Sequence, residues 1–164
     1  MPTFKSFSHR INYYKRMDFR IRTLRSYIKW NRRWERMKKF FNPHKPELDD
    51  SQEKVIEFFR MLIKNREAIL NHSVKAKIRY IETDFALVTL TGTSNDYMLR
   101  IIEDMDSKKP NSNEIPIPRE HALEIIEDFD LEMERRFRAL ENTIKKIVIN
   151  DINKLINKVK TGNN

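Results

Sequence analysis

Cations and aromatic rings are interleaved near the start of the chain, and they form the pattern best suited to chemistry. The first 46 residues hold 14 Lys and Arg against two acids, whereas the other 118 residues have a net charge of −3. Guanidinium and ammonium groups neutralise phosphates, and aromatic rings stack on exposed nucleobases. The predicted nucleic-acid-binding residues are ten cations and two indoles: Arg16, Arg20, Arg22, Arg25, Lys29, Arg32, Arg33, Arg36, Lys38, Lys39, Trp30 and Trp34.

A helix over residues 10–41, or two collinear ones, is expected to position these side chains. Neither Pro nor Gly interrupts it, and two apolar stripes about 130° apart run along it. Like charges on the remaining face repel by about 0.2–0.5 kcal/mol per pair, so a bound anion would stabilise the helix. We expect the first stripe to pack on the body and the second to be at least partly available to a partner. The stripes are Met17, Ile21, Leu24 and Ile28, then Tyr27, Trp30, Trp34, Met37 and Phe41.

In an alternative reading both stripes belong to the core. The cations on the remaining face, which we call the cationic ridge, would then form an ordinary solvated surface. A merely soluble face usually mixes both signs of charge, which favours the anion-binding reading.

The middle of the chain predicts one helix, a β-hairpin and a second helix. A break at Asn42–Pro46 precedes a helix at about 51–71, capped by Asp50 with Glu53. Alternation over 74–80 predicts a strand whose solvent face carries Lys75, Lys77 and Arg79, and 85–91 predicts its partner strand. A helix from Ser94 or Asn95 to about Asp106 and a loop over 107–118 follow.

The last helix is predicted over about 119–160 and resembles a coiled-coil strand. Residues 120–134 hold seven acids and no Lys or Arg, whereas 135–160 hold eight bases and two acids, which suits the helix dipole. Its apolar positions follow a 4-3-4-4-4-3-4 spacing, close to a heptad seam. The predicted oligomerisation residues are Met133, Phe137, Leu140, Ile144, Val148, Ile152, Leu155 and Val159.

The predicted fold is therefore mainly α with a small β-hairpin, in the α+β class. Its parts would be a long basic N-terminal helix, short central helices with a two-stranded hairpin at about 74–91, and a long C-terminal coiled-coil-like helix. The predicted domains are a basic, aromatic-rich helical arm over 1–46 and a helical body over 47–164.

Enzymatic chemistry is not expected from this composition. There is no Cys, the four His are scattered, and two isolated Gly cannot make a phosphate-binding loop, so neither a metal site nor a cofactor is predicted. Acids at 103–106 and 127–130 leave a metal-dependent nuclease open. No run approaches the ~18 apolar residues of a membrane span. The expected location is the cytoplasm or the interior of a virion.

The first predicted function is non-enzymatic binding of DNA or RNA through phosphate contacts, with low sequence specificity. The alternative is a structural or assembly protein, such as a phage or virion component. It would oligomerise through its last helix and dock the basic arm on an acidic partner, for example residues 120–134 of another copy. A third reading, a peripheral membrane helix, is weakened because the two apolar stripes do not share one side.

Overall fold

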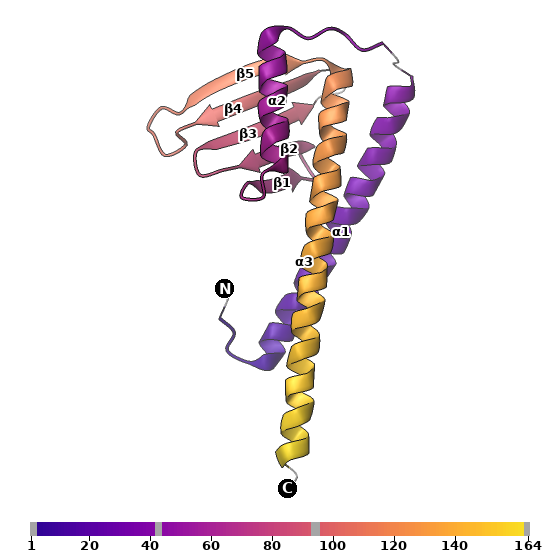
Figure 1. Ribbon diagram of the computed structural model, residues 1–164, viewed down its shortest axis with the longest axis vertical. Helices are drawn as coiled ribbons and strands as arrows, with labels where there is room; N and C mark the ends of the chain where they lie inside the picture. Colours follow the sequence, from indigo (N-terminus) through magenta and orange to yellow (C-terminus); the bar gives the residue numbers. More distant parts are fainter. Residues whose placement is uncertain (1–2, 42–43, 93–95, 163–164) are drawn as a thin grey trace. The chain divides into compact units, whose positions relative to one another are not determined.

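The structure, a computed structural model, describes residues 3–41, 44–92 and 96–162 (Figure 1). Over these residues the chain forms three helices and five strands, so the predicted α+β class is confirmed. The elements in chain order are α1 (Phe7–Phe40), α2 (Asp50–Lys64), β1 (Ile69–Ser73), β2 (Ile78–Glu82), β3 (Ala86–Gly92), β4 (Tyr97–Glu103), β5 (Asn111–Ile117) and α3 (Arg119–Gly162).

The chain divides into two compact units, and both α1 and α3 contribute to each of them. The sheet unit, Tyr27–Met133, contains the five strands, α2, the second half of α1 and the first third of α3. The helix-pair unit combines Met1–Ser26 with Glu134–Asn164. The predicted separation into an arm and a body at residue 46 stays a prediction.

The sheet is an antiparallel meander with the order β1-β2-β3-β4-β5. Side chains alternate between its two faces, so the register determines which residues share the core. Ile81 lies opposite Val88, and Leu90 lies opposite Leu99, and all four are buried. Residues of the other face, such as Tyr80 and Thr89, are half-exposed. The helices therefore cover one face of the sheet.

Helix α2 lies across the covered face, as Figure 1 shows. Its buried positions Ile56, Phe59 and Ile63 follow the three-to-four residue spacing of an amphipathic helix. The rings of Phe59 and Phe129 stack with centroids 6.2 Å apart, which joins α2 to α3. From α1, Ile28 is fully buried in the same core.

The helix-pair unit is an antiparallel pairing of the first half of α1 with the C-terminal part of α3. Arg10 contacts Asp151 at 3.0 Å, and Arg25 contacts Glu141 at 2.6 Å. Ile21 and Ile144 are the buried apolar side chains between these ion pairs. Buried apolar side chains, with an ion pair on either side of them, therefore hold the two helices together.

The prediction of a two-stranded hairpin is corrected to a five-stranded sheet. The predicted pair exists as β2 and β3, but β2 begins at Ile78 because residues 74–77 form a turn in which Lys77 has a φ of 51°. The predicted helix 51–71 ends at Lys64, and Ile69–Ser73 is strand β1. Its apolar residues Ile69 and Leu70 fit a helical period as well as a strand.

The helix predicted up to Asp106 is also corrected, because Tyr97–Glu103 is strand β4. A short, nearly continuous apolar run does not distinguish a buried strand from a helix. The predicted loop 107–118 contains β5, an edge strand rich in Asn, Ser and Pro. Pro116 is compatible with pairing there because only one side of an edge strand is hydrogen-bonded.

The helix positions are closer to prediction. The capping box uses Asp49 and Gln52, one residue before the predicted pair. Helices α1 and α3 differ from their predicted ranges by three residues or fewer at each end. The predicted break at Asn42-Pro43 and the predicted cap at Ser94 or Asn95 lie outside the described residues.

Candidate nucleic-acid interface

The second half of α1 has one side turned into the sheet unit and another turned to solvent. Ile28 anchors the inner side, where it is fully buried. Trp30 and Trp34 lie on the outer side with 71 % and 55 % of their surfaces exposed. This matches the expected division between a packed aliphatic stripe and an available aromatic stripe.

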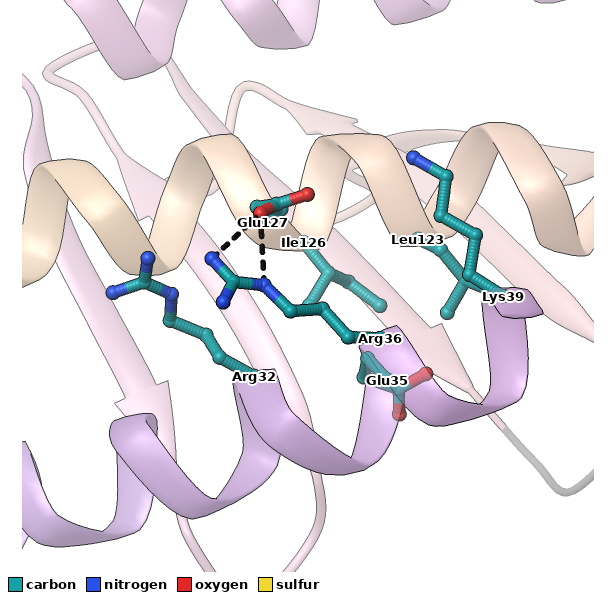
Figure 2. A pocket seen from close by; sticks show the side chains of 7 residues that line it. All are labelled: Arg32, Glu35, Arg36, Lys39, Leu123, Ile126 and Glu127. Carbon is teal, nitrogen blue, oxygen red and sulfur yellow. Dashed lines mark hydrogen bonds and ion pairs between the residues drawn. The ribbon is translucent and has the colours of Figure 1, made fainter.

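Two cations of the predicted ridge, Arg36 and Lys39, pair with acids of α3 within the sheet unit. Figure 2 shows Arg36 reaching Glu127, with nitrogen–oxygen distances of 3.3 and 3.4 Å. Lys39 lies 3.8 Å from Glu124, which also accepts a hydrogen bond from Lys45 at 2.8 Å. Burial alone would raise the pKa of Glu124, but the hydrogen bond and the neighbouring cations outweigh it and lower the pKa. This part of the ridge already has its anionic partner.

The remaining predicted cations differ in their partners. Arg22 and Arg25 pair with Asp18 and Glu141, and Lys38 lies 3.6 Å from Glu35. Arg32 is half-buried. Of the ten predicted cations, those that are exposed and make no ion pair with a described residue are Arg16, Arg20, Lys29 and Arg33.

We call the solvent side of α1 in the sheet unit the aromatic–basic face. Its rings and cations recur at spacings of three and four residues, so they project to one side of the helix. Phe40, at 83 % exposure, ends it. A contiguous apolar surface of this kind on a helix is typical of an interaction site. The face consists of Lys29, Trp30, Arg33, Trp34, Met37 and Phe40.

A polar pocket of about 370 Å³ lies beside this face, within the size range of small-ligand sites. Gly92 makes room at its edge, because a Cβ there would lie 2.3 Å from the Tyr97 ring. Burial raises the pKa of Tyr97, which keeps its hydroxyl protonated. The lining residues are Asn31, Trp34, Glu35, Lys38, Lys77, Arg79, Gly92 and Tyr97.

A buried ion pair forms the floor of this region. The Arg79 guanidinium donates hydrogen bonds to both carboxylate oxygens of Asp130, at 3.0 and 3.1 Å. Asn31 donates a longer hydrogen bond to the same carboxylate, at 3.5 Å. Arg79 is 4 % exposed, so the prediction that it belongs to a solvent face is wrong. The pair joins strand β2 to helix α3.

His72 lies between this ion pair and α1. Its ring meets that of Tyr27 edge-on, with centroids 4.9 Å apart, and both ring nitrogens are buried without a hydrogen-bond partner among the described residues. Burial, reinforced by the charge of Arg79, lowers the pKa of His72 to about 4. His72 is therefore a neutral side chain in the folded protein at neutral pH.

We expect His72 to make the protein less stable in mild acid. Between pH 6.5 and 4 the unfolded chain protonates this residue and the folded chain does not, so stability falls as the pH falls through that range. After allowance for solvent screening the loss is about 2 kcal/mol. Urea unfolding at pH 7 and pH 4.5 measures it, and His72→Leu should reduce the difference between the two pH values. An unchanged difference in the variant would assign the acid sensitivity to other groups.

The predicted oligomerisation residues do not share one environment. Met133 and Ile144 are buried, whereas Phe137 and Val148 are half-buried. The exposed members of the predicted seam are Leu140, Ile152, Leu155 and Val159. Apart from Leu140, the first half of the seam serves the chain's own packing, and the last turns of α3 keep an apolar side in solvent.

The metal site that the two acidic clusters left open has no counterpart in the part of the chain that the structure describes. No group of three or more His, Asp or Glu side chains there is arranged to hold a metal ion. No described helix has both the length and the hydrophobicity needed to cross a membrane.

Comparison of the chain with protein-family models, with characterised proteins and with solved structures finds no match. Function therefore has to be argued from the side chains alone. Sequence reasoning missed the pocket residues Asn31, Glu35 and Tyr97 and the Asp130 side of the ion pair. The one signal in the sequence was that Arg79 lies in a predicted strand whose end is apolar. Whether such an Arg faces the core depends on the strand register.

Proposed function

We propose that the protein binds single-stranded nucleic acid through the aromatic–basic face of α1. The observation that carries the proposal is the exposure of Trp30 and Trp34, each next in sequence to a cation, Lys29 or Arg33, that has no ion pair among the described residues. Aromatic rings stack on bases of any sequence, and the interleaved cations neutralise the phosphates. Such binding needs no catalytic residue.

A single strand suits this face better than a duplex. Bases inside a duplex already stack on one another, so the indoles would have nothing to contact except through unpaired regions. A duplex would be bound through its phosphates, but five of the ten predicted cations already pair with acids, as the Arg36–Glu127 pair shows. Of the ten cations predicted to bind nucleic acid, the aromatic–basic face therefore offers Lys29 and Arg33.

Salt dependence tests the number of phosphate contacts. If Lys29 and Arg33 each neutralise one phosphate, affinity for a single strand should fall with a log–log slope of about −1.4. Replacing Lys29 and Arg33 by Glu should abolish most binding and leave the helical circular dichroism unchanged. The matched control, Lys54→Glu with Lys64→Glu on α2, makes the same change in net charge. Equal losses in both variants would indicate a general charge effect and contradict a localised interface.

A second candidate, an assembly protein, is favoured by the last turns of α3. These turns expose five aliphatic side chains: Ile149, Ile152, Leu155, Ile156 and Val159. The acidic docking site predicted on another copy is less favoured, because Glu124 and Glu127 already pair with cations of their own chain.

Self-association would depend on this aliphatic surface. Leu155→Asp places a charge within it and should convert an oligomer to a monomer in sedimentation velocity. The control Asn153→Asp adds the same charge two residues away. A wild-type protein that is monomeric at all accessible concentrations would remove the assembly candidate.

A further inference from the structure

We propose that the pocket beside Trp34 selects a guanine base, with Trp34 stacking on it and Glu35 reading its hydrogen-bonding edge. The proposal rests on the proposed function, because the base would belong to the single strand held on the aromatic–basic face. It adds a base preference to a face that would otherwise be indifferent to sequence.

Trp34 belongs both to the aromatic–basic face and to the pocket wall. A base stacked on its ring would therefore lie at the entrance of the pocket, and its edge would project toward the polar lining. Recognition of single-stranded RNA commonly combines stacking on an aromatic ring with hydrogen bonds to the Watson–Crick edge. The two requirements meet here on adjacent residues of one helix.

Glu35 supplies acceptors at the next position. Its Oε2 atom is buried and has no hydrogen-bond partner among the described residues, although its side chain lines the pocket. Figure 2 shows its carboxylate directed away from Glu127, the acid that pairs with Arg36. A buried carboxylate oxygen without a donor is costly, and a ligand whose N–H groups met this oxygen after the carboxylate turned toward the pocket would remove that cost.

Lys38 supplies a donor next to these acceptors. Its Nζ lies 3.6 Å from Oε1 of Glu35 and 5.7 Å from the centroid of the Trp34 ring. The pocket therefore presents a donor over one face of the Trp34 ring, with the Glu35 acceptors beside that donor. An ammonium donates only and a carboxylate accepts only, so this order cannot be inverted.

Guanine is the base whose edge complements that order. It presents the O6 acceptor beside the N1–H and N2–H donors, which match Lys38 and the two Glu35 oxygens. Uracil places an acceptor where the second donor is needed, and adenine and cytosine each have an acceptor where guanine carries N1–H. Each of them would leave a carboxylate oxygen facing a lone pair.

Lys77 is placed to contact the phosphate of the bound nucleotide. It lines the same pocket, and it makes no ion pair among the described residues. Arg79 is already held by both oxygens of Asp130, so it contributes positive potential without leaving its partner.

The test uses GMP, IMP, AMP, CMP and UMP with the full-length protein carrying Trp30→Phe. Emission then comes from Trp34 alone, since the chain contains two tryptophans. GMP should quench it and bind at least about 10-fold more tightly than AMP, CMP or UMP, from two hydrogen bonds to a charged group. IMP, which lacks only the N2 amino group, should bind about 10-fold more weakly than GMP.

Glu35→Gln in the same background should remove the preference for GMP, because an amide offers one acceptor in place of two. Glu57→Gln removes the same charge from an exposed position of α2 and should change nothing. Thermal unfolding shows whether either variant is folded. Equal affinity for all five nucleotides, or a preference for GMP that survives Glu35→Gln, would overturn the proposal.

Oligonucleotides separate this proposal from the proposed function. If oligo(U) and G-containing strands bind with equal affinity, and GMP binds no more tightly than the other nucleotides, the guanine pocket is removed. The single-strand face would still be supported. Selective GMP binding without binding of any strand would retain the pocket and remove the single-strand function. If the protein binds neither a strand nor GMP, both proposals are removed.

Discussion

Replacing Asp130 by alanine is expected to lower the free energy of unfolding by about 3–5 kcal/mol, because it leaves a buried guanidinium without its partner. Asp130 is fully buried and accepts both hydrogen bonds of Arg79. A cation in that position cannot be rehydrated without opening the packing between β2 and α3. Urea unfolding followed by circular dichroism measures the loss.

Asp128 provides a control two residues away on α3. It is exposed and lies 3.7 Å from Arg60, so Asp128→Ala should cost only about 0–1 kcal/mol. Replacing both members of the buried pair by apolar residues, Arg79→Met with Asp130→Leu, should restore much of the stability. A double variant as unstable as Asp130→Ala would show that the pair contributes more than mutual neutralisation.

Replacing Trp30 and Trp34 together by alanine should weaken single-strand binding by about 2–6 kcal/mol, since each stacked ring contributes about 1–3 kcal/mol. Stability should change by no more than about 0.5 kcal/mol per site, because both rings are largely exposed. Fluorescence anisotropy of a labelled oligonucleotide measures the affinity. Thermal unfolding measures the stability.

Phe129→Ala is the contrasting control for the tryptophan pair. This ring is buried against Phe59, so its loss should cost about 3–5 kcal/mol of stability. A tryptophan double variant that behaves like Phe129→Ala would place the rings in a core. Full binding by a stable double variant would contradict the single-strand proposal.

The helices were predictable from the sequence because their signals are local. The absence of breakers over residues 10–41 and the capping pattern near Asp50 each lie within a few turns of the element they define. The two stripes of α1 likewise predicted which side would be buried, as Ile28 and Trp30 show. Periodicity within one helix carries that information without reference to the rest of the chain.

The sheet and the pocket were not predictable in the same way. Strand β4 reads as a helix because its apolar run is nearly continuous, and β5 reads as a loop because an edge strand tolerates turn formers. The partners of Arg79 and Arg36 lie 51 and 91 positions away in the sequence. Charge patterns alone cannot assign such pairs, so the sequence overstated how much of the ridge is available to a ligand.

The contacts between α1 and α3 should also affect the rate and the order of folding. Each strand of the meander pairs with its neighbour in the chain, whereas the contact between Arg36 and Glu127 spans 91 positions. Contacts between distant positions require larger loops to close and slow folding. The acidic part of α3 is also made long after α1 when the chain is synthesised from its N-terminus. The nascent basic segment must therefore remain without these carboxylates until most of the sheet unit has been made.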